Sequence, residues 1–362
     1  MMRVLTPAEL RALQRVRAHP AISILMPTAR AFPENQQNPT RLRDLLRQAE
    51  QRLLQLLDKR QAEPYLRRLQ ELAEAIDWRH PQDGLALFVN ADYSGAFWLP
   101  FPVSERVLLD ATFATKDLVR ALSRSVSYLV LALSEQQTRL WRGFQGQLQE
   151  VREHGFPFRF EFPAKAIGQP GPIPVDDGEY WQEQYRHFFR RVDQALGRAA
   201  ATEAQPLVVF GVDRWIALFR EVSAHSSWIV ATLNGSPDHE SEHELAQKSW
   251  RAVLQQMEEE QRRLVQEWRE APPGRRAAGL KAVWRAVLEG RVRVLLVEEG
   301  FRQPGRITED GYDVEPAEGP GPSQVEDLVD ELIERAIEGG AQIRFVADGA
   351  LPAERIAALL RY

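Results

Sequence analysis

The stretch HESEH, from His239 to His243, matches the HExxH pattern. On a helix, histidines four residues apart lie on one face and can bind Zn²⁺, while the glutamate activates a water molecule. The preceding Pro237 and Asp238 are typical of a helix start, so both histidines would lie in an exposed first turn. The sequence therefore favours a solvated, capped helix with no bound metal. A zinc hydrolase and incidental metal binding stay as alternatives.

A second candidate is the loop AKAIGQPGPIPVDDG, from Ala164 to Gly178, which carries Gly168 and Gln169 near its tip. The loop is too long for a plain connection and too rich in glycine and proline for a regular element. Long exposed loops on rigid scaffolds commonly carry function. The sequence therefore predicts a functional loop, with a purely structural loop as the alternative.

Regular elements should hold this loop on both sides. Phenylalanines alternate in FPFRFEFP, from Phe156 to Pro163, which predicts a strand with one aromatic face. In EYWQEQYRHFFRRV, from Glu179 to Val192, aromatic and apolar residues recur at helical spacing. Upstream, residues 127–151 predict two strands joined by a turn and followed by a polar third strand.

This segment resembles domain two of the archaeal and eukaryotic class I peptide release factors, whose loop presents Gly-Gly-Gln to the peptidyl-transferase centre. The residues that fall where that family has its Leu-Pro-Lys-Lys and Gly-Gln residues are Phe162, Pro163, Lys165, Gly168 and Gln169. The resemblance implies a peptidyl-transferase loop containing Lys165, Gly168, Gln169 and Gly171, with Gln169 as the candidate catalytic residue.

The resemblance continues on both sides of the loop. AISILMPTAR from Ala21 and QDGLALFVN from Gln82 are similar to the first domain of those factors. GRVRVLLVEEG from Gly290, EGGAQIRFVADG from Glu338 and RIAALLRY from Arg355 are similar to the third. The chain as a whole resembles the bacterial relatives of the archaeo-eukaryotic release factors and Pelota. The order and spacing of these motifs carry the resemblance.

In that family the two glycines adopt torsion angles closed to other residues, and the glutamine positions a water molecule or stabilises the oxyanion during peptidyl-ester hydrolysis. Here Ile167 replaces the first glycine, and Pro170 directly follows Gln169. A β-branched residue resists positive φ, and proline restricts the residue before it to extended conformations. We therefore expect ribosome binding without hydrolysis, with peptidyl-tRNA hydrolysis through Gln169 as the alternative.

The pattern of elements predicts an α/β protein of three domains, because 362 residues exceed one comfortable core. Residues 1–124 are expected to form a basic, mixed α+β domain. Residues 125–237 form an α/β domain that carries the 164–178 loop, and residues 238–362 an α/β/α sandwich. The elements expected in the last domain are helices at 240–268, 275–289, 323–338 and 352–360 and strands at 292–297 and 342–346.

Charge is spread unevenly along the chain. Its net value of −5 argues against a general binder of DNA or other nucleic acid, yet the balance is +4 over residues 1–124 and −6 over residues 241–362. A predicted helical pair in the first domain carries basic residues that could contact rRNA phosphates, with a solvated helix face as the alternative. These residues are Arg41, Arg43, Arg47, Arg52, Lys59, Arg60, Arg67 and Arg68.

Stop-codon reading is not expected. The eukaryotic factors use an Asn-Ile-Lys-Ser turn and a Tyr-x-Cys-x-x-x-Phe strand motif. Here the turn between the helices is DKRQAEP, from Asp58, and the strand motif becomes VLLDATF, from Val107, which keeps only Phe113.

Several classes of protein are excluded by absent residues and motifs. The chain has no cysteine, hence no disulfide, thiol nucleophile or thiolate metal site. It has no GxxxxGK[ST], GxGxxG or GxSxG motif, so no nucleotide cofactor or serine nucleophile is expected, and no other cofactor is implied. The start of the sequence, MMRVLTPAELRALQRV, lacks a long apolar run, so we expect neither a signal peptide nor a membrane span and place the protein in the cytoplasm.

The resemblance implies a translation factor that occupies the ribosomal A site in ribosome rescue or hibernation. The basic first domain would approach the small subunit and its rRNA, and the 164–178 loop the peptidyl-transferase region. The acidic third domain would engage a translational GTPase or the ribosomal stalk base. Because the loop departs from the family motif, we do not expect an enzyme; if the protein has an activity, it is peptidyl-tRNA hydrolysis.

Overall fold

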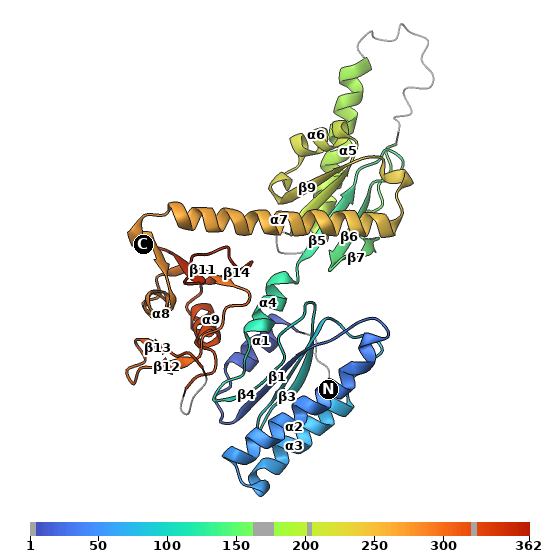
Figure 1. The fold of residues 1–362 in the computed structure, drawn as a ribbon. Coiled ribbons are helices and arrows are strands. Elements are labelled where there is room, and N and C mark those ends of the chain that lie inside the picture. The colour runs from blue at the N-terminus through green and yellow to red at the C-terminus, as the bar shows by residue number, and fades with distance from the viewer. Residues whose placement is uncertain (1–4, 162–176, 201–204, 320–323) are drawn as a thin grey trace. The chain divides into compact units, whose positions relative to one another are not determined.

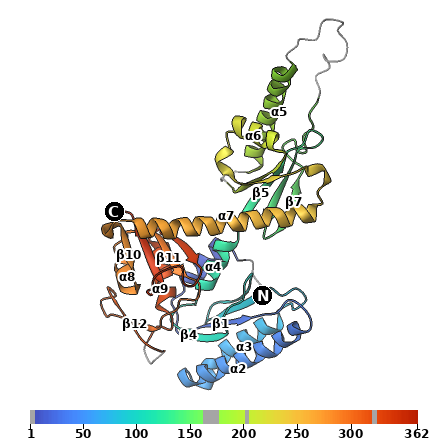
Figure 2. The ribbon, with the colours of Figure 1, turned by 45° about the horizontal axis from the view of Figure 1, so that its top comes forward.

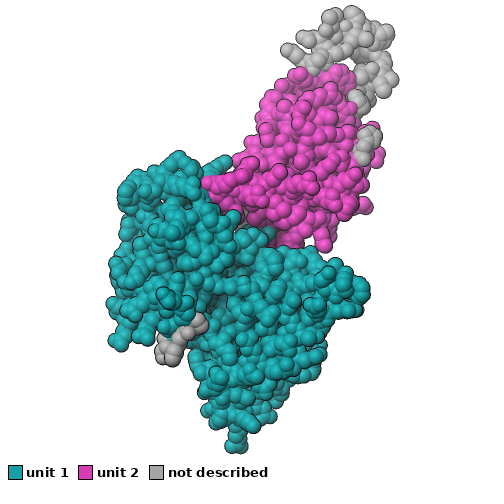
Figure 3. Space-filling view, in the orientation of Figure 1, with its two compact units in different colours: residues 1–124, 263–362 teal, residues 125–262 magenta. Residues whose placement is uncertain are grey.

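The computed structural model describes residues 5–161, 177–200, 205–319 and 324–362, apart from the side chains of residues 177–179 and 239. The chain divides into two compact units (Figure 3). Unit 1 contains residues 1–124, called the N-terminal half below, and residues 263–362, called the C-terminal half; unit 2 contains residues 125–262. Both units combine helices with β-sheets, so the predicted α/β class is confirmed. The division into three domains stays a prediction.

The N-terminal half of unit 1 is a four-stranded antiparallel sheet in the order β3-β2-β1-β4. Its elements are α1 (Pro7–Gln14), β1 (Ala21–Pro27), η1 (Glu34–Gln37), α2 (Asn38–Leu56), α3 (Lys59–Glu74), β2 (Gly84–Val89), β3 (Ser94–Leu99), β4 (Arg106–Asp110) and α4 (Lys116–Arg124). Helices α2 and α3 lie side by side on one face of the sheet (Figures 1 and 2). The predicted helical pair is therefore confirmed.

Strand β1 is buried on both faces because its side chains alternate between two cores. Ile22, Ile24 and Met26 pack against α2 and α3, while Ala21 and Leu25 face α1 and α4. The apolar stripe of α2 is buried from Leu42 to Leu53, although Leu56 at its end is half-exposed. Asp58 caps α3 through a reciprocal hydrogen-bond pair with Gln61, which separates the two helices.

The C-terminal half of unit 1 is built on a mixed sheet in the order β10-β15-β11-β14. Its elements are η5 (Pro273–Arg275), β10 (Arg276–Ala278), α8 (Leu280–Leu288), β11 (Val292–Glu298), β12 (Gly305–Ile307), β13 (Val314–Pro316), α9 (Leu328–Glu338), β14 (Gln342–Val346) and β15 (Ile356–Leu360). Strands β11 and β14 are parallel, and β15 is antiparallel to β10 and β11. Val265 and Trp268, at the end of α7 (Glu242–Glu270), cover one face, and α8 and α9 cover the other.

Two expectations for the C-terminal half were wrong. The predicted helix at 352–360 is strand β15, whose five residues are all buried between β10 and β11, so pairing and burial outweigh the helical propensity of its alanines. The predicted helix at 275–289 begins only at Leu280, because β10 pairs with β15 and Gly279 turns the chain at φ 83°.

Unit 2 is a five-stranded sheet in the order β7-β6-β5-β8-β9. Its elements are β5 (Ser127–Ala132), β6 (Arg139–Phe144), β7 (Gln147–Val151), α5 (Asp177–Ala199), β8 (Leu207–Gly211), α6 (Asp213–Val222), η3 (Ser226–Trp228), β9 (Ile229–Asn234), η4 (Pro237–His239) and the first part of α7. Helices α5 and α6 pack on one face and α7 on the other, which makes three layers. The three predicted strands between Ser127 and Val151 are confirmed.

The strand predicted for FPFRFEFP is wrong over the residues described. Only Phe158 pairs, through two hydrogen bonds with Thr138, the residue before β6 (2.8 and 2.9 Å). Pro157 has no amide hydrogen to donate, so a regular ladder cannot run through this segment.

Within the described ranges, none of the helices combines the length and the apolar character needed to cross a lipid bilayer.

Gly143 on β6 lies directly opposite Tyr128 on β5, and a Cβ atom at this position would lie 2.3 Å from Cζ of that tyrosine. The Tyr128 ring cannot move aside, because it is fully buried and stacks on Trp250 of α7. We expect Gly143→Ala to destabilise the protein by about 1–3 kcal/mol through overpacking. Thermal unfolding followed by circular dichroism checks this, with Gly274→Ala as the control, since nothing lies within 4 Å of that position. Equal melting temperatures for the two variants would contradict the packing argument.

Candidate functional site

The predicted loop residues Lys165, Gly168, Gln169 and Gly171 lie outside the described residues, so their roles stay a prediction. The structure describes the two elements that flank them: the segment from Phe156 to Glu161 and helix α5. These flanks form the frame of the candidate site.

An aromatic cluster joins the two flanks. Phe160 stacks on Tyr185 of α5 with ring centroids 4.3 Å apart, and its ring meets Phe188 edge-on at 5.6 Å. Phe158 meets the same Phe188 at 6.5 Å. The aromatic face predicted from the alternating phenylalanines therefore exists, although the backbone is not a regular strand. Each such pair contributes about 0.5–1.5 kcal/mol beyond its buried area.

Glu135, in the turn between β5 and β6, ties the same elements together through polar contacts. Its carboxylate accepts a hydrogen bond from the Tyr185 hydroxyl (2.9 Å) and pairs with Arg214 of α6 (3.1 Å). Its backbone carbonyl accepts a hydrogen bond from the Phe160 amide (3.1 Å). Burial and the neighbouring Glu135 carboxylate raise the pKa of Tyr185 to about 12, so its phenol keeps its proton over the physiological range.

Further along α5, the buried Asp193 fixes the segment that follows α6. Its carboxylate accepts hydrogen bonds from the Ser223 hydroxyl (2.5 Å) and the Ala224 amide (3.0 Å), and lies 2.9 Å from Nδ1 of His225. The serine and the histidine side chains both bind the carboxylate rather than each other. The arrangement therefore lacks the nucleophile–base contact of a catalytic triad and positions α5 within the unit.

The basic residues predicted to bind RNA fall into two groups. Three of them reach toward the body of unit 1: Arg41 donates to the Pro27 carbonyl, Arg52 to the Val107 carbonyl and Arg68 to the Asn90 carbonyl. Arg47 and Arg67 pair on the helix surface with Asp44 and Glu71, respectively.

The remaining three predicted RNA-binding residues, Arg43, Lys59 and Arg60, are exposed. Within the part of the chain that the structure describes, they form no ion pair or side-chain hydrogen bond. Their donors are open to solvent, so these are the residues of the set best placed to meet a phosphate.

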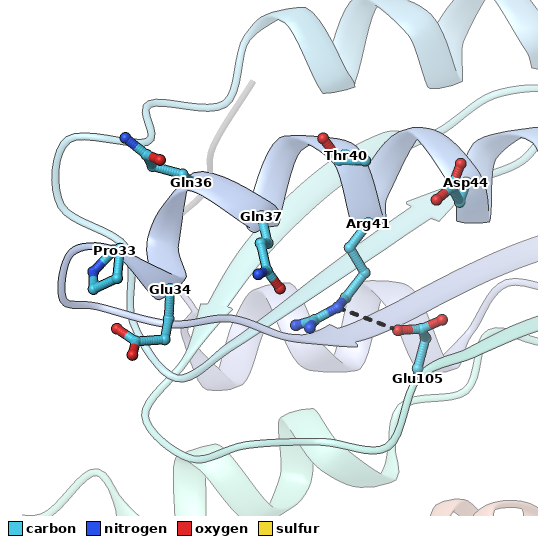
Figure 4. Close-up of a pocket in the computed structure, with 8 residues that line it drawn as sticks. All are labelled: Pro33, Glu34, Gln36, Gln37, Thr40, Arg41, Asp44 and Glu105. Atoms are coloured by element: carbon cyan, nitrogen blue, oxygen red, sulfur yellow. Dashed lines mark ion pairs between the residues drawn. The ribbon is translucent and has the colours of Figure 1, made fainter.

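A surface depression lies at the start of α2 (Figure 4). It is lined by Pro33, Glu34, Gln36, Gln37, Thr40, Arg41, Asp44 and Glu105. Arg41 already pairs with Glu105 across it, at 3.5 Å. Because three carboxylates and only one guanidinium group line the depression, it is unsuited to a phosphate or another anion.

The HExxH pattern does not lie on one helix. His239 ends the short helix η4, Glu240 and Ser241 are not helical, and His243 lies in the first turn of α7. The helix start expected at Pro237 lies instead at Ser241, which exchanges hydrogen bonds with Glu244 in a capping box. Among the residues with described placement, no three His, Cys, Asp or Glu side chains gather as they would around a metal ion.

Sequence reasoning missed helix α4 and the buried charges around Lys116 at its start. The local signal was a Thr-Lys-Asp triplet before an apolar helical pattern that begins at Leu118. A lysine is also unusual in this chain, where arginine supplies most of the basic residues. Nothing in that triplet shows which distant residues surround it.

One family model matches part of the chain. Residues 127–291 match the model of Bacterial archaeo-eukaryotic release factor family 3, a range that starts at β5 and extends beyond unit 2 into the C-terminal half. The resemblance to this bacterial group that the sequence indicates is thereby confirmed. No curated protein sequence gives a significant match.

Several solved structures are similar to the chain. An archaeal translation termination factor, aRF1, is 18% identical, with 98% of this chain and 96% of that chain covered and a TM-score of 0.25. Pelota from Archaeoglobus fulgidus is 15% identical, with 77% and 79% covered and a TM-score of 0.35. A model of ribosome-bound archaeal Pelota and ABCE1 is 11% identical, with 100% and 95% covered and a TM-score of 0.41.

The aromatic cluster predicts how the frame responds to mutation. Phe160→Ala should remove the ring contacts to Tyr185 and Phe188 and speed amide hydrogen exchange in residues 156–161, because local opening becomes easier. Exchange in β5 and β8 should stay unchanged. The matched control is Phe144→Ala, since that ring is 48% exposed on β6 of the same unit. Equal exchange of residues 156–161 in both variants would show that the ring contacts of Phe160 do not hold this segment in place.

Proposed function

We propose that the protein is a cytoplasmic, ribosome-associated translation factor that occupies the A site during ribosome rescue or hibernation. The observation that carries this proposal is the family match over residues 127–291. It covers the frame built from Phe156–Glu161 and α5, which flanks the segment holding Gln169.

In this proposal the two parts of unit 1 meet different partners. The N-terminal half would approach rRNA through the exposed Arg43, Lys59 and Arg60 of the α2–α3 hairpin. The C-terminal half, in the more acidic part of the sequence, would engage a basic surface on a translational GTPase.

We favour occupancy of the ribosome over peptide release. Ile167 replaces a glycine of the family motif, and Pro170 restricts Gln169. Hydrolysis of peptidyl-tRNA through Gln169 is the second candidate function, because the Gly168–Gln169 pair itself is retained.

The test is co-sedimentation of the purified protein with vacant and with peptidyl-tRNA-loaded bacterial 70S ribosomes, with released peptide counted in the same tubes. Binding to vacant ribosomes without release supports an occupying factor. Release that Gln169→Ala abolishes would instead establish the hydrolase. Absence of binding to either ribosome would overturn the proposal.

The triple variant Arg43→Glu, Lys59→Glu, Arg60→Glu should weaken ribosome binding. If all three side chains contact phosphates, the magnitude of the slope of log affinity against log salt should fall by about 2–3, because fewer counterions are released. Binding assays at several salt concentrations give this slope.

A control variant with the same change in net charge is Arg251→Glu, Arg262→Glu, Arg263→Glu on the exposed side of α7. If this control weakens binding as much as the hairpin variant does, the effect reflects total charge and the hairpin is not the rRNA contact.

A further inference from the structure

A cluster of buried charged side chains lies inside unit 1 where its two halves meet. Lys116, at the start of α4 in the N-terminal half, is 1% exposed. Asp330 and Glu334, on α9 in the C-terminal half, are 6% and 2% exposed. Ionisable groups are rarely buried this far without a specific arrangement of partners.

Asp330 caps a helix that belongs to the other half of the unit. Its two carboxylate oxygens accept hydrogen bonds from the backbone amides of Thr115 and Lys116, at the N-terminus of α4. The first amides of a helix have no partner within it, and a negative charge there also interacts favourably with the helix dipole. The start of α4 is therefore completed by a residue more than two hundred positions away in the sequence.

Lys116 extends this link through its side chain. Its Nζ donates to the Phe301 carbonyl and lies 3.7 Å from Asp327, both in the C-terminal half. The next residue, Asp117, pairs with Arg106 of β4 and lies 3.7 Å from Arg302. Positive and negative groups from the two halves thus alternate across the junction.

The end of α4 is held from the same side. Arg120 and Arg124 both pair with Glu299, directly after β11. Between the two ends, Leu118 and Val119 pack in one apolar core with residues of α9. Helix α4 is joined by sequence to the N-terminal half but is bound along its length by the C-terminal half.

Glu334 has the fewest hydrogen-bond partners of the carboxyl groups in the cluster. Its Oε1 accepts a hydrogen bond from the Thr115 hydroxyl (3.1 Å), which in turn accepts one from Gln14 (3.2 Å). Its Oε2 makes no hydrogen bond to any residue in the described ranges, and the half-exposed Arg17 lies 3.5 Å away. This carboxyl group has the fewest partners to stabilise a negative charge.

We propose that Lys116, Asp330 and Glu334 form a latch that holds the two halves of unit 1 together as one rigid body, and that its opening lets the halves move apart. The latch is independent of the proposed function, because it concerns only the coupling of the two halves. Opening of the latch would change the distance between the α2–α3 hairpin and the C-terminal sheet.

Deprotonation of Glu334 is the natural trigger for opening. Burial and the nearby carboxylates of Asp330 and Glu331 raise the pKa of Glu334 to about 9, against the weaker opposing effects of Arg17 and Thr115. Burial and the charges of Asp327 and Glu331 likewise raise the pKa of Asp330. The neutral form of Glu334 is favoured in the closed state, so its contribution is fully present at low pH and is lost as the pH rises through about 9.

The test uses pairs of spin labels, since the chain has no native cysteine to interfere. Gln55→Cys on α2 and Ala353→Cys before β15 place one label on each half at exposed positions. Pulsed dipolar spectroscopy at pH 7 should give one narrow distance distribution for the labelled protein. In Asp330→Asn a second or broader distribution should appear, because an amide offers one oxygen to two backbone donors.

Glu338→Gln is the matched control, as Glu338 lies on the same helix with an exposed side chain. It should leave the distribution unchanged. If Asp330→Asn fails to fold, Thr115→Val provides a milder change that removes only the hydroxyl between Gln14 and Glu334. A narrow, unshifted distribution in every folded latch variant would overturn the proposal.

Raising the pH provides the second arm of the test. At pH 10 the distribution of the labelled protein should broaden, and Glu334→Gln, which mimics the protonated carboxyl group, should stay narrow at both pH values. Identical behaviour of the two proteins at pH 10 would show that Glu334 does not control the latch. Ribosome binding plays no part in this measurement, so its outcome is separate from that of the co-sedimentation.

Discussion

The capping of α4 by Asp330 is the contact on which the architecture of unit 1 depends. Unit 1 is assembled from two stretches of chain separated by the whole of unit 2. Apolar packing draws them together, but packing alone tolerates sliding, whereas a carboxylate that accepts two backbone amides fixes position and direction. Because the contact is buried, removing either partner leaves an uncompensated polar group in the core and destabilises the unit.

Unit 2 is stabilised next to the candidate site mainly by contacts between aromatic rings. It holds residues 156–161 against α5 through the stacking of Phe160 on Tyr185, supported by the Glu135 carboxylate from a neighbouring turn. Rings pack tightly without demanding exact partners, so this frame could accept variation in the segment between its ends. Unit 1, by contrast, depends on exact pairing.

Sequence patterns predicted the elements whose residues interact locally. The alternating burial of β1, the α2–α3 pair and strands β5 to β7 follow from periodicity within short windows. Strand β15 was mistaken for a helix because its environment, two flanking strands, comes from elsewhere in the chain. The burial of Lys116 could likewise not be predicted from the local sequence, because its partners Asp327 and Asp330 lie far away in sequence. The candidate loop was located by its composition and by resemblance, and its geometry lies outside the described residues.

The split construction of unit 1 has a consequence for synthesis. When the N-terminal half leaves the ribosome, the first amides of α4 still lack the Asp330 carboxylate, and the core that contains Leu118 and Val119 still lacks its residues from α8 and α9. All of unit 2 must be translated before α9 follows, a delay on the order of 10 s at bacterial elongation rates. During that interval α4 is uncapped, and the nascent chain exposes the apolar side chains that later pack against α8 and α9. The polar Lys116 and Asp117 at the start of α4 would then keep this intermediate hydrated, so the residues that later join the halves also limit premature association.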